Sequence, residues 1–254
     1  MSELAGKVAL ITGASKGIGA ATAIVLAAKG VKVALCARSL DSLQALADDI
    51  NADGGEAVAI ACDVSKYDDV VAATQKCLSA FGSLDILVNN AGLIDPISTI
   101  ADSDPEAWVQ VADVNYKGVY FGLRAALPIM LEQGSGTIIN ISSGAATGAL
   151  EGWSHYCSSK AAVLSLTKCT HVEYGDKGIT VIGLSPGTVA TAMQISIKAS
   201  GINPVSQLDP SVHIPADWPA RAVAWLCTEE AKEFSGTDFS LKSDEGRRRI
   251  GLID

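Results

Sequence analysis

The chain has 254 residues, a formal net charge of −9 and 48% hydrophobic residues. This length and apolar fraction are typical of one large globular domain, so we expect a single domain over residues 1–254. The acidic balance disfavours nucleic acid as a partner, because nucleic-acid binding normally needs a basic face.

Apolar strand-like runs alternate with helix-like stretches along the chain. The runs are continuous, which is typical of strands buried on both faces of a parallel sheet. Strands are predicted over 7–12, 31–36, 56–61, 84–89, 136–141, 179–184 and 237–241. Crossover helices are predicted over 18–29, 42–51, 68–81, 105–131 and 154–174. The pattern predicts a doubly wound α/β fold that binds ligands at the carboxyl ends of its strands.

A glycine-rich turn follows the first predicted strand and leads directly into a helix. Its glycines, Gly13, Gly17 and Gly19, have the spacing Gly-x-x-x-Gly-x-Gly, not the tighter Gly-x-Gly-x-x-Gly. Glycine lets the backbone turn sharply and approach a pyrophosphate, whose charge the helix N-terminus stabilises. The turn could merely join strand to helix, but its position favours dinucleotide binding.

A serine, a tyrosine and a lysine stand in the order Ser143, Tyr156, Lys160. On a helix, the four-residue separation places Tyr156 and Lys160 on one face. A nearby ammonium should lower the pKa of the phenol from its usual value of about 10, so that it can exchange a proton near neutral pH. Ser143 follows a predicted strand, and its hydroxyl could hold the reacting oxygen. A surface lysine beside a half-buried tyrosine is the alternative for the pair alone.

The chain is similar to the short-chain dehydrogenase/reductase family over nearly its whole length. Besides the motifs above, the similarity rests on Asp63-Val64, Asn89-Asn90-Ala91-Gly92, Asn115 and Pro186-Gly187-x-x-x-Thr191. It implies a Rossmann-type fold with a seven-stranded parallel sheet of order 3-2-1-4-5-6-7. It also implies reversible reduction of a ketone or aldehyde, with hydride from a nicotinamide and Tyr156 as general acid/base.

The same similarity assigns roles to individual residues. Asn115 would hold a water in a proton relay through Lys160, and Ser143 rather than Ser142 has the family's interval to the tyrosine. Asp63 and Val64 would contact adenine, although Asp63 could also be a simple turn residue. The implied cofactor set is Gly13, Ser15, Lys16, Gly17, Ile18, Gly19, Arg38, Asp63, Val64, Asn90, Ala91, Gly92, Tyr156, Lys160, Pro186, Gly187, Val189 and Thr191.

The residues after the second predicted strand bear on the choice between NAD and NADP. NAD-binding folds commonly place an acid there to hold the ribose hydroxyls, but this chain has Ala37-Arg38-Ser39. Arg38 can grip a 2′-phosphate through its fork of donors, and Lys16 adds a second positive charge. Either could be an ordinary solvated cation; together they predict a preference for NADP(H).

The expected substrate pocket is mostly apolar. Its predicted lining is Leu93, Ile94, Ala145, Leu150, Trp153 and Met193, although Trp153 could equally pack against the substrate loop. This lining favours a hydrophobic carbonyl compound. A 3-oxoacyl thioester carried by an acyl carrier is the enzymatic alternative, and a non-catalytic NADP(H) sensor or scaffold is the alternative of another class.

Three further expectations concern the surroundings of the pocket. The stretch 189–217 contains several prolines and is predicted to be an irregular, mobile lid. The surplus of apolar residues on helices 105–131 and 154–174 predicts a homodimer or homotetramer. The C-terminal Arg247, Arg248 and Arg249 depart from the family pattern and are interpreted as a solvated tail.

The remaining sequence features favour a cytoplasmic enzyme without a metal. No apolar run reaches the ~18 residues of a membrane span, and the N-terminal residues lack the basic start and apolar stretch of a signal peptide. The six cysteines form no Cys-x-x-Cys pair, and the three histidines are dispersed, so no metal site is predicted. His155, beside Tyr156, is interpreted as part of the pocket rim.

Overall fold

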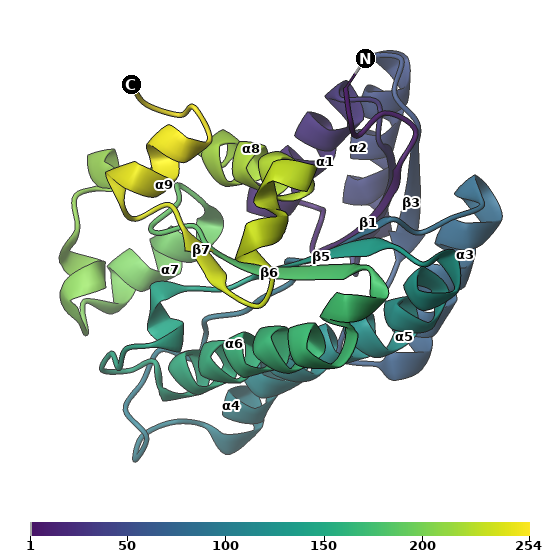
Figure 1. Cartoon of the computed structure of the whole chain (residues 1–254). Helices are drawn as coiled ribbons and strands as arrows, with labels where there is room; N and C mark the ends of the chain where they lie inside the picture. The colour runs from purple at the N-terminus through teal and green to yellow at the C-terminus, as the bar shows by residue number, and fades with distance from the viewer. Residues whose placement is uncertain (1) are drawn as a thin grey trace.

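The centre of the molecule is one parallel sheet of seven strands in the order β3-β2-β1-β4-β5-β6-β7. Figure 1 shows the computed structural model, which describes residues 2–254. The predicted fold class and strand order are therefore confirmed, with strand ends that differ by one or two residues. The strands are β1 (Val8–Thr12), β2 (Lys32–Ala37), β3 (Ala57–Ala61), β4 (Ile86–Asn89), β5 (Gly136–Ile141), β6 (Ile179–Ser185) and β7 (Asp238–Ser240).

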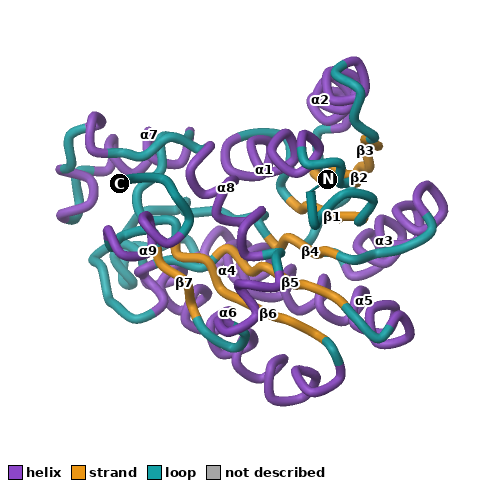
Figure 2. Tube along the Cα trace, turned by 45° about the horizontal axis from the view of Figure 1, so that its top comes forward, coloured by secondary structure: helices purple, strands orange, loops and turns teal. Residues whose placement is uncertain are grey.

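Helices cover both faces of the sheet (Figures 1 and 2). One face carries α1 (Gly17–Ala28), α2 (Leu40–Ala52) and α8 (Asp217–Leu226). The other carries α3 (Tyr67–Phe81), α4 (Pro105–Ala112), α5 (Gly118–Gln133) and α6 (Ser154–Tyr174). Two shorter helices, α7 (Ala192–Ser200) and α9 (Asp244–Arg249), lie toward the β7 edge of the sheet.

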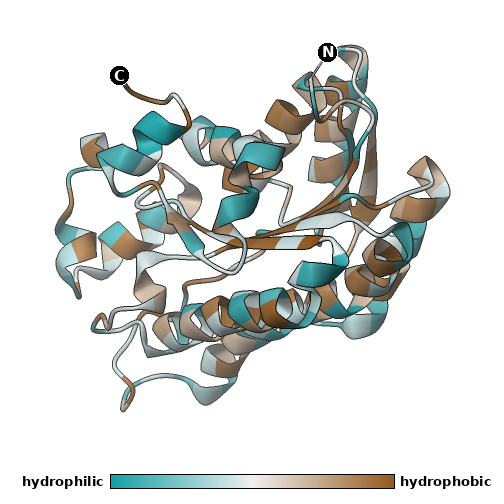
Figure 3. Cartoon of the chain, in the orientation of Figure 1, coloured by the Kyte–Doolittle hydropathy of each residue, from teal (hydrophilic) through white to brown (hydrophobic). Residues whose placement is uncertain are grey.

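The sheet separates two hydrophobic cores, because alternate side chains of each strand point to opposite faces. Ile11 and Leu35 pack into the core beneath α1 and α8, whereas Leu10 and Ala34 pack into the core beneath α3 and α5. Every residue of β1 is buried, as expected for a strand covered on both sides. The strands at the centre of the sheet are accordingly mostly brown, that is hydrophobic, in Figure 3. None of the helices described is long and apolar enough to cross a membrane.

The predicted irregular region 189–217 contains more helix than expected. It holds α7 and two 3₁₀ turns, Pro204–Gln207 and Pro210–Val212. Each turn places its proline in the first helical position, where the missing N–H costs nothing. The residues before the prolines, Asn203 and Asp209, cap the turns with their side chains. The prolines therefore begin helical turns, and the prediction of irregular structure was wrong for this reason.

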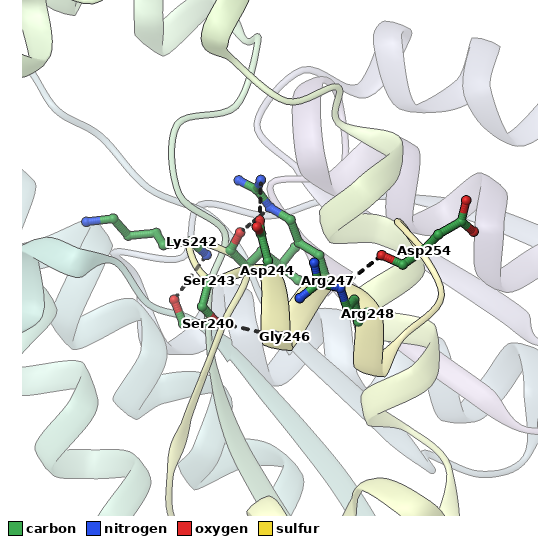
Figure 4. A network of polar contacts seen from close by, with 9 residues as sticks. Ser240, Lys242, Ser243, Asp244, Gly246, Arg247, Arg248 and Asp254 are labelled. Atoms are coloured by element: carbon green, nitrogen blue, oxygen red, sulfur yellow. Dashed lines mark hydrogen bonds and ion pairs between the residues drawn. The ribbon is translucent and has the colours of Figure 1, made fainter.

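The arginines of α9 do not form the solvated tail that was predicted. Arg247 forms an ion pair with Asp244, at 3.5 Å, and its guanidinium lies 5.6 Å from the ring centroid of Trp218 on α8. Arg249 pairs with Glu230 at 3.5 Å. Figure 4 shows part of this polar network around α9. Arg247 and Arg249 thus fasten the C-terminal helix to preceding elements, whereas Arg248 is exposed and bonds the backbone oxygen of Asp254. The sequence pattern alone could not reveal these partners.

Candidate active site

The three candidate catalytic side chains meet at the carboxyl end of β5. Tyr156 and Lys160 are one turn apart on α6 and are 9% and 5% exposed. Lys160 Nζ donates a hydrogen bond to the backbone oxygen of Ile141, at 2.6 Å, and lies 5.6 Å from the ring centroid of Tyr156. Ser143 lies two residues beyond Ile141 and hydrogen-bonds with Tyr156. The geometry thus brings together the serine, tyrosine and lysine that the sequence singled out.

The pKa of Tyr156 differs from the sequence-based expectation. Burial raises the pKa of the phenol to about 12, and the hydrogen bond with Ser143 only partly offsets this effect. Burial also lowers the pKa of Lys160 to about 8. The free-energy cost of burying the Tyr156 phenolate is therefore larger than the stabilisation that the Lys160 ammonium gives it. A phenol of this kind is protonated at neutral pH and can serve as a general acid.

Asn115 lies in a short π-helical turn, Asp113–Lys117, that joins α4 to α5. Its side chain accepts a hydrogen bond from Leu93 N, at 2.7 Å, and donates one to Leu93 O, at 2.9 Å. Its Nδ2 also lies 3.3 Å from Ser159 Oγ on α6. π turns inside helices occur often at functional sites. Here the turn interrupts the single helix predicted over 105–131 and points a fully buried amide at the segment after β4 and at α6.

The glycine turn forms a cradle that fits a pyrophosphate. Gly13 and Gly17 have φ angles of +65° and +58°, which only glycine adopts readily. A Cβ on Gly19 would lie 2.4 Å from the Gly13 oxygen, so the turn is too tight for a side chain there. Helix α1 begins at Gly17 without a side-chain cap or an acid in its first turn. Its N-terminal amides are therefore free to face an anion.

Two other predicted cofactor segments are held against this turn. Asn90 Nδ2 donates to the backbone oxygens of Thr12 and Gly13, at 2.9 and 3.1 Å. A Cβ on Gly17 would lie 3.3 Å from Thr191 Cγ2, which places the segment beginning at Pro186 beside the turn. The residues therefore fit a dinucleotide laid across the point where the strand order reverses between β1 and β4.

The predicted adenine-side residues lie at the ends of β2 and β3. Arg38 is exposed and follows β2 directly. Burial alone would raise the pKa of Asp63, but hydrogen bonds from Ser65 and the nearby charges of Lys66 and Arg38 hold it below its usual range. Val64 is buried against Gly118, so its side chain belongs to the core. Lys16, at the start of α1, is also exposed.

The predicted substrate residues form one apolar cluster, apart from Leu93. Its buried members are Ile94, Ala145, Trp153, Tyr156 and Ile197, and Leu150 and Met193 pack against them. Leu93 packs against the core beneath α3 and α5 instead. The Trp153 ring meets the Tyr156 ring edge-on, with centroids 5.5 Å apart. Met193 and Ile197 come from α7, so this helix supplies one side of the cluster.

The prediction that His155 forms part of the pocket rim is wrong, because the residue is buried. It is 1% exposed, and its Nε2 lies 2.6 Å from the Ile94 oxygen. The residue therefore holds the segment after β4 against the start of α6. Among the residues described, no group of three histidines, cysteines, aspartates or glutamates is arranged to hold a metal ion.

Sequence reasoning missed two charged residues at the β7 edge. Asp238 lies on β7, and its carboxylate acts electrostatically on Lys160. Lys242 is exposed and follows β7, and its Nζ lies 3.3 Å from the position of a Cβ on Gly144, the neighbour of Ser143. Asp238 lies within the predicted strand 237–241, and Lys242 follows it. These charges could have indicated the site, because ligands bind at the carboxyl edge of such a sheet.

This fold and its site define a Rossmann-type oxidoreductase with a tyrosine–lysine centre. A family model described as short chain dehydrogenase matches residues 7–201. The chain therefore belongs to the short-chain dehydrogenase/reductase family, whose members use NAD(P)(H).

Individual known proteins are similar to this chain over nearly its whole length. It is 33% identical over 236 residues to a cyclohexanol dehydrogenase of Acinetobacter sp. (strain SE19), covering 92% of each chain. It is 36% identical over 244 residues to a 3-oxoacyl-[acyl-carrier-protein] reductase of Synechocystis sp. (strain ATCC 27184 / PCC 6803 / Kazusa), covering 95% of this chain and 97% of the other. The crystal structure of levodione reductase superposes with a TM-score of 0.87 at 30% identity, covering 95% and 98%.

Proposed function

We propose that the protein is an NADP(H)-dependent carbonyl reductase that converts a ketone or aldehyde to an alcohol, reversibly. The observation that carries the proposal is the burial of Tyr156 beside Lys160 and Ser143, at the edge of an apolar cluster. The pKa of about 12 keeps the phenol protonated at neutral pH, which favours the reductive direction. Oxidation of the alcohol needs the phenolate and gains from higher pH.

Each polar residue of the site would have its own role in the reaction. The Ser143 hydroxyl holds the carbonyl oxygen by a hydrogen bond. The bound nicotinamide would supply the hydride for the carbonyl carbon. Tyr156 donates its proton to the oxygen as the C=O π bond breaks, so the product is a neutral alcohol. Lys160 stabilises the phenolate that remains, and Asn115 supports the path by which a proton returns to it.

The preference for NADP(H) is proposed from the residues after β2. Arg38 is exposed there, no acid stands beside it in Ala37-Arg38-Ser39, and Lys16 lies at the start of α1. Both cations can approach a 2′-phosphate, and an arginine fork suits that group well.

The substrate class that the cluster fits best is a hydrophobic ketone, such as a cyclic one. Apolar side chains surround Tyr156, and two of the similar proteins are named as a cyclohexanol dehydrogenase and a levodione reductase. A second candidate is a 3-oxoacyl thioester, which one relative's name includes. Lys242 favours it, because an ammonium beside the entrance could bind the phosphate of an acyl-carrier arm.

The experiment that tests the function is a cofactor-oxidation screen. NADPH consumption is measured with cyclic and aromatic ketones, with aldehydes and with acetoacetyl thioesters, and the assays are repeated with NADH. We expect the highest kcat/KM with a free hydrophobic ketone and NADPH. Higher kcat/KM for the thioester would select the second candidate. Cofactor binding without consumption across the panel would instead identify a non-catalytic sensor or scaffold.

We also propose a homodimer or homotetramer, in which α4, α5 and α6 pair with a second copy. Val109 on α4, Tyr120 on α5 and Val172 on α6 are 50%, 48% and 81% exposed, and a symmetric partner would cover such apolar groups. The altered C-terminal segment makes the tetramer the weaker part of this proposal. Light scattering at micromolar protein should return at least twice the 26.1 kDa of one chain. The mass of a single chain would contradict the proposal.

Two smaller proposals follow from the same site. The segment 189–217, with α7, would close over the nicotinamide when substrate binds, because it supplies one side of the apolar cluster. Substrate and cofactor together should then slow proteolysis of this segment, and equal cleavage with and without them would count against closure.

All six cysteines are free, which suits a reducing compartment such as the cytoplasm. Localisation of a tagged protein outside the cytoplasm would oppose that assignment.

A further inference from the structure

A carboxylate lies under α6 at the edge of the candidate active site. Asp238 on β7 pairs with Gly183 on β6, so its side chain points to the same face of the sheet. A Cβ on Gly183 would lie 2.6 Å from Asp238 Oδ1, which confirms this orientation. The face is the one that α6 covers, because Val181, two residues before Gly183, packs in the core on that side.

The hydrogen bonds of this carboxylate are incomplete. Asp238 Oδ2 accepts a hydrogen bond from Ser185 Oγ, at 2.6 Å, and Ser185 is 2% exposed. Asp238 Oδ1 is buried and has no hydrogen-bond partner of good geometry among the residues described. The Ser142 hydroxyl beside it is also buried and has no well-formed bond. Asp238 as a whole is half-buried, but a buried carboxylate oxygen without a partner is costly unless another charge compensates it.

Two lysines of α6, Lys160 and Lys168, act electrostatically on Asp238. Lys168 is exposed, so solvent screens its effect on the carboxylate. Lys160 is 5% exposed, so its interaction with Asp238 takes place where the dielectric constant is low. Among the residues described, Lys160 uses one of its three donors, on the Ile141 oxygen, and Ile141 directly precedes Ser142. Lys160 is therefore the main compensating charge for Asp238.

We propose that Asp238 is the counter-charge of Lys160 and a positioning residue for the reaction. It touches neither substrate nor nicotinamide; it keeps the Lys160 ammonium protonated beside Tyr156. The inference rests on the proposed function, because it assumes that Lys160 serves Tyr156. The competing explanation is structural: Asp238 would only fasten β7 to β6 through Ser185.

The direction of the effect follows from the charges. Burial lowers the pKa of Lys160 to about 8, and Asp238 opposes that fall. Burial raises the pKa of Asp238, and the hydroxyls of Ser185 and Ser142 and then the charge of Lys160 oppose that rise. Without the carboxylate, Lys160 would lose its proton at a lower pH. The ammonium that stabilises the Tyr156 phenolate would then be lost earlier as the pH rises.

The test replaces Asp238 by asparagine, which keeps the shape and an acceptor for Ser185. Lysine Cε signals are followed by ¹³C NMR titration in enzyme without cofactor, and the Lys160 signal is assigned by its loss in Lys160→Arg. We expect the Lys160 midpoint to fall in Asp238→Asn, because the variant removes the carboxylate charge that raises the pKa of Lys160. Asp176→Asn removes an exposed carboxylate and should leave the midpoint unchanged.

A second readout is the pH profile of ketone reduction, whose alkaline limb should move to lower pH in Asp238→Asn. A Lys160 midpoint equal to that of the wild type would overturn the inference, even if turnover fell, because a purely structural role predicts that result. The NMR titration needs neither substrate nor cofactor, so it stays decisive if no carbonyl compound is reduced and the proposed function fails. If Asp238→Asn does not fold, Asp238→Ser, which also removes the carboxylate charge, replaces it. The Lys160 midpoint should again fall, and no change would again overturn the inference.

Discussion

Changing Tyr156 to phenylalanine should lower kcat for carbonyl reduction by about 10³-fold or more, within the range typical of a lost general acid. The variant removes one oxygen and keeps the ring that meets Trp153 edge-on, so the apolar cluster should stay packed. The hydroxyl that hydrogen-bonds with Ser143 is lost, and with it the group proposed as the general acid. The Kd for NADPH, measured by fluorescence titration, should change less than about threefold, because the phenol oxygen supplies little of the binding energy.

Tyr174 offers a matched control on the same helix. It lies at the C-terminal end of α6, and its ring is 5.0 Å from Lys177 Nζ, so it repeats the tyrosine–lysine contact away from the site. Tyr174→Phe should keep wild-type kcat. Near-normal turnover by Tyr156→Phe over a broad ketone panel would show that another group supplies the proton. Equal losses in both variants would indicate a general effect on α6.

The sheet and its helices could be predicted because the signal for them is local. The continuous apolar runs, the glycine turn and the helix lengths each reflect one element, and the strand order follows from the family that these motifs indicate. The interruption of 105–131 by a π turn at Asn115 could not be predicted from the local pattern, and the partner of Asn115, Leu93, lies 22 positions away in the sequence. The helical turns at Pro204 and Pro210 were missed because proline both begins helices and marks loops.

For the site, the sequence likewise reveals which residues are present but not their burial or their distant partners. The sequence was sufficient to find Ser143, Tyr156 and Lys160. It could not reveal that burial raises the pKa of Tyr156 to about 12, because burial depends on the packing of α6 and of α7 against the segments after β4 and β5. It could not connect Asp238 to Lys160 either, since the two residues are 78 positions apart and the charge of Asp238 acts on Lys160 only when β7 joins the sheet.

The preference for NADPH should be reversed by changing Arg38 to aspartate. Arg38 is exposed at the end of β2, and in the wild type its guanidinium would hold the 2′-phosphate with charge-assisted hydrogen bonds. Such bonds contribute about 1.5–3 kcal/mol, and the new carboxylate would add repulsion of the phosphate. We expect the Kd for NADPH to rise about 100-fold, whereas NADH, which has no phosphate there, should bind as well or better through its ribose hydroxyls.

The measurement compares the Kd and kcat/KM values of both cofactors in the wild type and in Arg38→Asp. Arg124→Asp is the matched control, because Arg124 is also an exposed arginine but lies on α5, on the opposite face of the sheet from α1 and α2. It changes the net charge by the same amount and should leave the ratio of the two Kd values unchanged. If both variants weaken NADPH binding equally, the effect comes from net charge, and Arg38 does not bind the 2′-phosphate specifically. A wild type that uses NADH more efficiently than NADPH would refute the preference before any variant is made.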